Sequence, residues 1–184
     1  MPVRLFTVRR LEFAIACCGL VVGIAVNGAQ DQPAKTPDIH YTPTRHAIAD
    51  AMLQMAQVGK TDVVYDLGSG DGRIPIIAAQ KYGARGVGIE INPALVELSN
   101  VNARDAGVTD RVSFITGDLF TADLSAATVI TMYLSPSVNA LLEGKLRALR
   151  SGTRIVSHQF PIGRWTPDAT KQVDESQLLL WRIR

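Results

Sequence analysis

The chain has 184 residues, of which 47% are hydrophobic and 20% charged, and its formal net charge is +2. This length and balance are typical of one globular domain with a sizeable core. The positive surplus lies within residues 1–29, so residues 30–184 carry no net charge. Nucleic-acid binding depends largely on phosphate neutralisation, and a neutral domain therefore argues against a nucleic-acid substrate. Cys17 and Cys18 are the only cysteines, which excludes a disulfide, a thiolate metal site and a cysteine nucleophile from the rest of the chain.

Residues 1–29 have the pattern of a targeting segment. Basic residues precede the apolar run Phe13–Val26, and small and polar residues follow it. As a helix this run would span roughly 21 Å, less than the ~30 Å hydrocarbon core of a bilayer, which favours a signal-like segment over a stable anchor. We expect residues 1–29 to engage a membrane or export machinery, and the alternatives of cleavage, anchoring and a late translation start stay open. Residues 30–41 read as a polar, proline-bearing linker.

The domain is expected to begin with a helix at residue 42. Thr42 is a suitable N-cap and Pro43 suits the first helical position. Apolar residues from Ile48 to Met55 follow at helical spacing, and Gly59 is the expected end. Tyr41, just before this helix, lines the mouth of a substrate site or simply packs against the domain.

A glycine-rich turn follows the next apolar strand. Val63–Tyr65 suit a strand that is buried on both faces, and residues 66–72 read Asp-Leu-Gly-Ser-Gly-Asp-Gly. Glycines let the backbone turn tightly and approach a ligand. A dinucleotide fingerprint would need a further glycine at position 73, where the chain has Arg73. A carboxylate at Asp66 would repel a pyrophosphate at the helix N-terminus but suits a ligand with an ammonium group.

Strands and helices alternate after this turn. The expected helices are Ile74–Tyr82, a segment from Pro93 to before Gly107, and a segment from Pro136 to before Gly152. The expected strands are Gly86–Glu90, Arg111–Ile115, Ala127–Tyr133 and Arg154–His158, and the run Leu178–Ile183 belongs to a closing antiparallel pair. The pattern predicts an α/β fold with a doubly wound, mostly parallel sheet and an antiparallel C-terminal strand pair.

Helical spacing also predicts which side chains face the sheet. Leu95, Leu98 and Val101 are the expected inward residues of the helix that Asn92 caps. In the helix that Ser135 caps, the expected inward set includes Leu141.

Polar side chains fall where the predicted strands end. These residues are Asp66, Glu90, Asp118, Tyr133 and His158. Ligands of doubly wound sheets bind beyond the carboxyl ends of the strands, so we expect these side chains to share one site.

The segment Asp66–Gly72 resembles motif I of the class I (seven-strand, Rossmann-like) methyltransferases. Glu90 lies about 20 residues beyond the glycines, where such folds place an acid on ribose hydroxyls. The resemblance implies S-adenosylmethionine as the cofactor, no metal, and an adenine contact at Asp118, whose alternative role is to cap its own turn. The implied cofactor-binding residues are Asp66, Gly68, Ser69, Gly70, Gly72, Glu90 and Asp118.

A narrower resemblance concerns the methyl acceptor. Segments across about Tyr41 to Trp181 are similar to the small protein-lysine methyltransferases of the ATP synthase c subunit and the adenine nucleotide translocase; they include Tyr65–Ile74, Leu134–Val138, Leu142–Arg147 and Arg154–Pro161. This similarity implies a lysine of a membrane protein as acceptor, a monomeric enzyme and a membrane-associated or targeted location, with a cytosol-facing domain as the alternative. The substrate-pocket candidates are Tyr41, Tyr133, Ser135, Pro136 and His158.

Other acceptors and roles stay open. Adenine-N6 and glutamine methyltransferases carry an Asn/Asp-Pro-Pro-aromatic motif after the fourth strand, whereas this chain has Tyr133-Leu134-Ser135-Pro136. A small-molecule or RNA methyltransferase and a non-catalytic cofactor-binding protein are the alternatives. A lysine of pKa ~10.4 must be neutral before it attacks, and the sequence identifies no general base for that step.

Overall fold

The computed structural model describes residues 42–184, so the predictions for residues 1–29, 30–41 and Tyr41 lie outside the described residues. The helices are α1 (His46–Met55), α2 (Arg73–Tyr82), α3 (Pro93–Asp105) and α4 (Pro136–Arg147). The strands are β1 (Val63–Leu67), β2 (Arg85–Glu90), β3 (Val112–Thr116), β4 (Val129–Met132), β5 (Arg154–His158), β6 (Ala169–Val173) and β7 (Ser176–Arg182). None of these helices has the length and apolar character that crossing a membrane requires.

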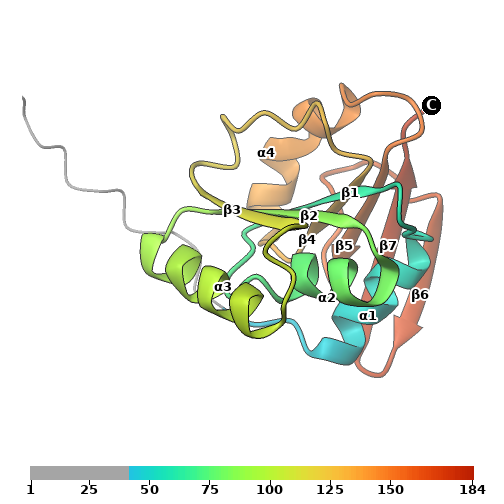
Figure 1. Cartoon of the computed structure of the whole chain (residues 1–184). Coiled ribbons are helices and arrows are strands. Elements are labelled where there is room, and N and C mark those ends of the chain that lie inside the picture. Colours follow the sequence, from blue (N-terminus) through green and yellow to red (C-terminus); the bar gives the residue numbers. More distant parts are fainter. Residues whose placement is uncertain (1–41) are drawn as a thin grey trace, which may run out of the picture. The chain divides into compact units, whose positions relative to one another are not determined.

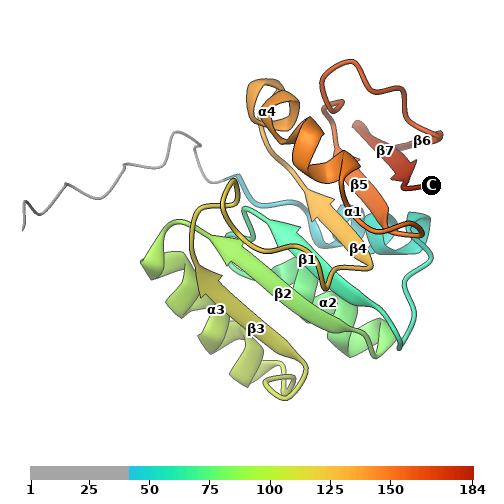
Figure 2. The same cartoon turned by 90° about the horizontal axis from the view of Figure 1, so that it is seen from above.

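All strands join in one sheet with the order β3-β2-β1-β4-β5-β7-β6. Strands β1 to β5 pair in parallel, whereas β7 is antiparallel to both β5 and β6. The chain runs outward from β1 to β3 and then returns to the other side of β1, so the topology reverses between β1 and β4. Figure 2 shows the arrowheads of β1 to β4 at one edge of the sheet. The predicted doubly wound sheet with its antiparallel C-terminal pair is confirmed.

Helices cover both faces of the sheet (Figure 1). On one face α1 and α2 pack on the sheet, with Ile48, Met52 and Ile77 among the buried side chains. On the other face α4 contributes Leu142 and Leu146 to a second apolar cluster. The central strands β1, β4 and β5 are therefore buried on both sides, which explains their nearly continuous apolar sequences, whereas the edge strand β3 is partly exposed.

Helix α1 begins later than its sequence suggested. Arg45 is the N-cap, so Thr42 and Pro43 precede the helix instead of starting it. The Arg73 guanidinium donates a hydrogen bond to the Thr44 carbonyl at 2.8 Å, which ties this segment to the start of α2. The helix ends before Gln57, whose φ of 53° reverses the chain, rather than at Gly59.

The inward faces of α3 and α4 also differ from the prediction. On α3, Leu98 and Val101 are exposed, and Ser99 is buried with two small or branched apolar neighbours, Val96 and Ala103. On α4, Leu141 is 72% exposed, while the polar Asn139 is fully buried. Each helix thus turns a polar side chain, Ser99 or Asn139, toward the interior and leaves a predicted inward leucine exposed. The reason is that each polar side chain hydrogen-bonds to a neighbouring turn.

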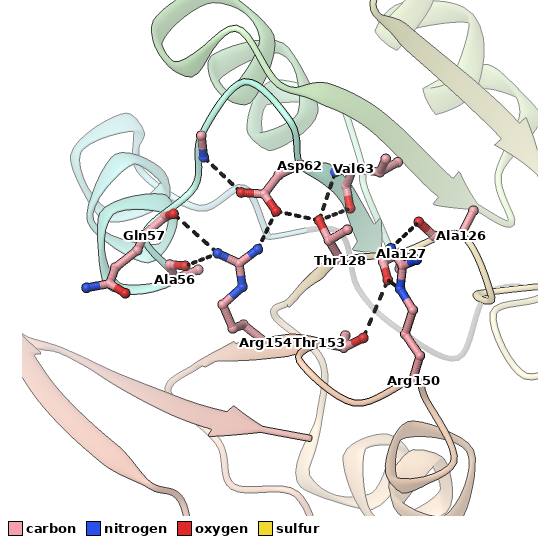
Figure 3. Close-up of polar contacts among 11 residues, drawn as sticks. Ala56, Gln57, Asp62, Val63, Ala126, Ala127, Thr128, Arg150, Thr153 and Arg154 are labelled. Atoms are coloured by element: carbon pink, nitrogen blue, oxygen red, sulfur yellow. Dashed lines mark hydrogen bonds and ion pairs between the residues drawn. The ribbon is translucent and has the colours of Figure 1, made fainter. Parts of the chain in front are cut away.

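A polar cluster links the central strands at their amino ends, which lie opposite the carboxyl ends marked by the arrowheads (Figure 3). The Asp62 carboxylate pairs with the Arg154 guanidinium and accepts from Thr128 Oγ1 at 2.7 Å and from the Gly59 N–H at 2.8 Å. Arg154 also donates to the Ala56 carbonyl at 2.8 Å, and so links the end of α1 to β5. This cluster connects β1, β4, β5 and α1, so its charges serve the fold rather than the predicted site.

Candidate functional site

The turn after β1 folds back onto β2. The N–H groups of Gly68 and Ser69 both donate to the Ile89 carbonyl, at 2.9 and 3.1 Å. Gly68, Gly70 and Gly72 have φ values of 74°, 54° and 78°, in the left-handed region where glycine alone is unstrained. The positive φ values confirm the tight turn that the glycines predicted.

Side chains from β2 and α3 hold this turn in place. Glu90 Oε2 accepts from the Gly70 N–H at 3.0 Å, and Ser99 Oγ donates to the Gly70 carbonyl at 2.9 Å. Asn102 Nδ2 donates to the Asp71 carbonyl at 2.9 Å. Glu90 thus lies against the glycine turn, and each of its carboxylate oxygens can accept further hydrogen bonds.

Asp66 is buried at the carboxyl end of β1. Its Oδ1 accepts from Thr131 Oγ1 on β4 at 2.7 Å. Burial raises the pKa of Asp66 to about 7; the Thr131 hydrogen bond opposes this rise, while the charges of Glu90 and Asp71 add to it. A positively charged ligand beside Asp66 would favour the ionised carboxylate, so this environment fits a cationic organic ligand.

Asp118 lies in a separate loop after β3. Its Oδ1 accepts from the Phe120 N–H at 2.9 Å, which caps its own turn. From α4, Lys145 Nζ donates to the Leu119 and Phe120 carbonyls, both at 2.9 Å, and to the Ala122 carbonyl at 2.5 Å. Burial lowers the pKa of Lys145, and neighbouring aspartates raise it in part. Lys145 therefore fixes the loop that presents Asp118.

The substrate-pocket candidates within residues 42–184 lie beyond β4 and β5. Tyr133 follows β4, and Ser135 and Pro136 are the N-cap and first residue of α4, as the sequence predicted. His158 ends β5 and is buried, with its ring centroid 4.1 Å from that of Tyr133. Burial lowers the pKa of His158, and the charge of Arg45 lowers it further, which favours the neutral imidazole.

The structure forms two groups from these candidates. The first joins Glu90 to the glycine turn and has Asp66 at its base; the second joins Tyr133 to His158. Both lie at the carboxyl edge of the sheet, on either side of the point where the strand order reverses. Asp118 lies in neither group and caps its own turn.

Sequence reasoning missed contributors to both groups. Thr131 could have been found, because it is a polar residue within an apolar strand and lies level with Asp66 in the parallel register. Phe160, whose ring centroid lies 6.2 Å from that of Tyr133 in the second group, gave no such signal, and neither did Lys145, which holds the separate Asp118 loop. A local sequence pattern does not identify a distant partner.

Two further observations concern ligands. Residues 42–184 contain no group of three or more His, Cys, Asp or Glu side chains that could hold a metal ion. The hydroxyl of Ser69, in the glycine turn, is buried and has no hydrogen-bond partner in the described structure. An unpaired buried hydroxyl in a turn of this kind fits a site that gains contacts when a ligand binds.

Comparison with known proteins identifies the family. The profile of the ANTKMT methyltransferase domain matches residues 66–169. A protein-lysine N-methyltransferase of Saccharolobus islandicus is 42% identical over 144 residues, which are 77% of this chain and 89% of that protein. The adenine nucleotide translocase lysine N-methyltransferase of Mus musculus is 42% identical over 113 residues, which are 60% of this chain and 49% of the mouse protein. This chain therefore spans about half the length of the mouse protein.

A solved structure supports the same conclusion. The crystal structure described as an RNA methyltransferase from Salinibacter ruber, in complex with S-adenosyl-L-homocysteine, has 54% sequence identity and a TM-score of 0.76. The match covers 77% of this chain and 94% of the Salinibacter chain. The glycine turn, the buried carboxylate and these relatives agree: the chain is an S-adenosylmethionine-dependent methyltransferase and belongs to the ANTKMT methyltransferase domain family.

Proposed function

We propose that this enzyme methylates the side-chain amine of a lysine in a protein. The observation that carries the proposal is the 42% identity to a protein-lysine N-methyltransferase, over a match that includes 89% of that relative. The second relative is named for a membrane protein, the adenine nucleotide translocase. A lysine of a membrane protein is therefore the acceptor that these similarities favour.

We assign the cofactor contacts to the first group of site residues. We assign Asp66 to the cationic part of the ligand, because burial raises its pKa to about 7 and a positive charge beside the carboxylate would favour its ionised form. Glu90 receives the ribose hydroxyls, and Asp118 receives the adenine amino group. We assign the turn residues Gly68, Ser69, Gly70 and Gly72 as further contacts to the ligand. A Cβ on Gly68 would lie 2.9 Å from Leu134, so this position has room only for glycine.

The main contribution of the protein to the reaction is to position the two reactants. S-adenosylmethionine, when bound, would supply a methyl group on a sulfonium; the neutral amine of the acceptor would attack the methyl carbon in line as the C–S bond breaks, and S-adenosylhomocysteine would leave. The protein must therefore hold the acceptor amine, keep it neutral and exclude water. Tyr133, the Ser135–Pro136 segment and His158 lie where they can desolvate the lysine, and desolvation lowers the pKa of an amine.

An RNA acceptor is the second candidate. It is favoured by the description of the Salinibacter structure as an RNA methyltransferase, at 54% identity. The neutral charge balance of residues 30–184 weighs against it, since RNA binding normally requires a basic surface.

We also propose that residues 1–29 bring the enzyme to a membrane. Their basic start and apolar run support this placement, and a membrane-protein acceptor would make it useful. Fractionation of source cells would test it: the full chain should sediment with membranes, and a chain beginning at residue 30 should not. Equal distribution of the two chains would contradict the proposal.

The acceptor is tested by labelling. Residues 30–184 are incubated with radiolabelled S-adenosylmethionine and, separately, with membrane proteins, soluble proteins and RNA from the source cells. We expect acid-stable label in a membrane-protein band, released as methyl-lysine on hydrolysis. Label in RNA alone would overturn the lysine proposal and leave the methyltransferase fold unaffected. Asp66→Ala and Glu90→Ala should abolish labelling, and retention of label in both would contradict the assigned cofactor site.

A further inference from the structure

Phe160 adds a third ring to the second group of site residues. The Tyr133 and Phe160 ring centroids are 6.2 Å apart, and their planes differ by only 9°. Tyr133 and Phe160 are half-buried, whereas His158, on the Tyr133 ring at 4.1 Å, is buried. The three rings form an aromatic surface at the carboxyl edge, beyond β4, the strand that pairs with the Asp66 strand.

The backbone that carries two of these rings is strained. Gln159 has a φ of 70°, although it is not glycine. The Phe160 N–H donates to the His158 carbonyl at 2.9 Å, which closes a turn of three residues. A γ-turn with positive φ at its centre is rare and strained, and it persists only where surrounding contacts hold it.

The Gln177 carbonyl, which accepts from the Gln159 N–H at 2.7 Å, supplies one of these contacts, and Asn139 on α4 supplies others. Its Nδ2 lies 3.1 Å from the Phe160 carbonyl, 3.2 Å from the Pro161 carbonyl and 3.3 Å from Ser157 Oγ. Ser157 Oγ in turn donates to the Phe160 carbonyl at 2.6 Å. Asn139 is fully buried, and its Oδ1 has no partner among the described residues. Burial of an amide whose oxygen is unpaired is unfavourable. We therefore attribute the role of Asn139 to its Nδ2 group, whose hydrogen bonds hold the turn.

We propose that Asn139 positions the aromatic surface of Tyr133, His158 and Phe160, and that this surface receives the acceptor lysine. This inference rests on the proposed function, because it names the residues that would hold its substrate. Aromatic faces pack against a methylene stem and attract a methylated ammonium. If the turn relaxed, Phe160 would move away from Tyr133, and the amine would lose its alignment with the methyl group.

The test compares two alanine variants on α4 in the full chain. Asn139→Ala removes the donors to the turn, and Leu141→Ala is the matched control, because Leu141 is 72% exposed on the same helix. Each protein is titrated with the heat-treated, detergent-solubilised membrane-protein fraction and radiolabelled S-adenosylmethionine. We expect Asn139→Ala to raise the half-saturating amount of acceptor about tenfold, with a smaller change in maximal rate. Leu141→Ala should match the unmodified enzyme.

Three further measurements separate positioning from a general loss of structure. Calorimetry should give an unchanged S-adenosylmethionine Kd for Asn139→Ala, since its side chain hydrogen-bonds to Ser157, Phe160 and Pro161 and thus to the segment after β5. Adding Gln159→Gly should restore part of the acceptor affinity, because glycine adopts a φ of 70° without strain. Phe160→Leu should raise the half-saturating amount similarly. It replaces a half-buried ring with a smaller apolar side chain, so we expect this variant to fold.

The outcomes distinguish this inference from the proposed function. If the unmodified enzyme methylates lysine and Asn139→Ala leaves the half-saturating amount unchanged, the inference is wrong and the proposed function stands. The same holds if Gln159→Gly gives no rescue, or if cofactor and acceptor binding fall together. Label that enters only RNA would overturn both.

Discussion

At the scale of single residues, Asp66 shows how binding and stability conflict in this site. The carboxyl is buried, with one hydrogen bond from Thr131, and burial raises its pKa to about 7. In the unfolded chain the same carboxyl has its ordinary pKa near 3.8. The folded protein therefore binds a proton that the unfolded chain releases. The resulting stability is fully present below about pH 4 and is lost as the pH rises through 7.

Replacement of Asp66 by asparagine should prevent this loss of folding stability at high pH. Asn keeps an oxygen for the Thr131 hydroxyl and carries no charge, so the variant should be about 2–4 kcal/mol more stable than the unmodified protein at pH 8. The difference should shrink toward pH 4. Urea unfolding of the ligand-free proteins at the two pH values measures it. S-adenosylmethionine binding should be lost in the same variant, and a variant that binds normally would contradict the assigned role of Asp66.

Cofactor affinity should depend on pH through the same carboxyl. Because a cationic ligand requires the ionised form, the Kd for S-adenosylmethionine should be nearly constant above pH 8. It should rise by up to about tenfold per pH unit well below pH 7. Calorimetric titrations between pH 5.5 and about 8.5 measure this dependence. A Kd that stays constant across that interval would show that Asp66 is ionised without the ligand.

At the scale of elements, the β1–α2 turn is fitted to its neighbours as well as to a ligand. A Cβ on Gly72 would lie 2.6 Å from the Phe114 ring and 2.8 Å from Ser99 Cβ. Small residues on the inward face of α3 therefore reflect the close approach of this turn. The polar Ser99 serves the same contact through its hydrogen bond to the Gly70 carbonyl.

Alanine at Gly72 should destabilise the protein for two reasons. A left-handed φ of 78° disfavours a side chain, and the new methyl group overlaps Phe114. Together these effects should cost about 2–4 kcal/mol of unfolding free energy. Gly144→Ala is the control, because nothing lies within 4 Å of a Cβ there and alanine favours a helix such as α4. In chemical unfolding, Gly72→Ala should have a lower unfolding free energy than the unmodified protein, and Gly144→Ala a higher one. Equal losses in the two variants would refute the packing argument.

Lys145 links α4 to the loop that carries Asp118. Lys145→Met removes three donors to loop carbonyls and keeps most of the aliphatic stem. We expect the loop to loosen and the Kd for S-adenosylmethionine to rise about three- to tenfold, since Asp118 is assigned to the adenine group. Lys171→Met, which removes a charge from an exposed position on β6, should leave the Kd unchanged. Identical Kd values for both variants would mean that the loop is held without Lys145.

At the scale of the whole molecule, the two ends of the sheet carry charges with different purposes. The carboxyl end holds Asp66 and Glu90 beside a ligand turn, and the amino end holds Asp62 paired with Arg154 (Figure 3). Burial alone would raise the pKa of Asp62. Hydrogen bonds from Thr128, Gly59 and Arg154, together with the Arg154 charge, nevertheless bring that pKa below its ordinary value. Asp62 therefore stabilises the fold above pH 4, and this contribution is lost as the pH falls through the lowered pKa.

Asp62→Asn should leave Arg154 without its charged partner. We expect a loss of about 2–4 kcal/mol at pH 7, which shrinks as the pH falls below about 4, and an unchanged cofactor Kd because the cluster lies at the far end of the sheet. Thermal unfolding and calorimetry measure the two quantities. Asp110→Asn is the control, since Asp110 pairs with Arg111 in an exposed position where such pairs contribute little. A cofactor Kd that changes with Asp62→Asn would mean that the two ends are coupled.

The sequence alone determined the order of the elements, the class of sheet and the location of the glycine turn after β1. These features depend on local signals: apolar runs for buried strands, Asn92 and Ser135 as helix caps, and glycines where φ must be positive. Asp66 and Glu90 were predicted together because parallel strands bring their carboxyl ends to one edge. Each of these inferences needs only neighbouring residues and the regular geometry of a βαβ unit.

The tertiary structure alone decided which side chains meet across that framework. Helical spacing placed Leu98 and Leu141 inward, yet contacts with distant turns bury Ser99 and Asn139 instead. The contact of Phe160 with Tyr133 and the bonds from Lys145 to the Asp118 loop likewise join segments far apart in the sequence. The physical reason is that burial and hydrogen bonding depend on which segments lie opposite one another, and no local pattern records that choice.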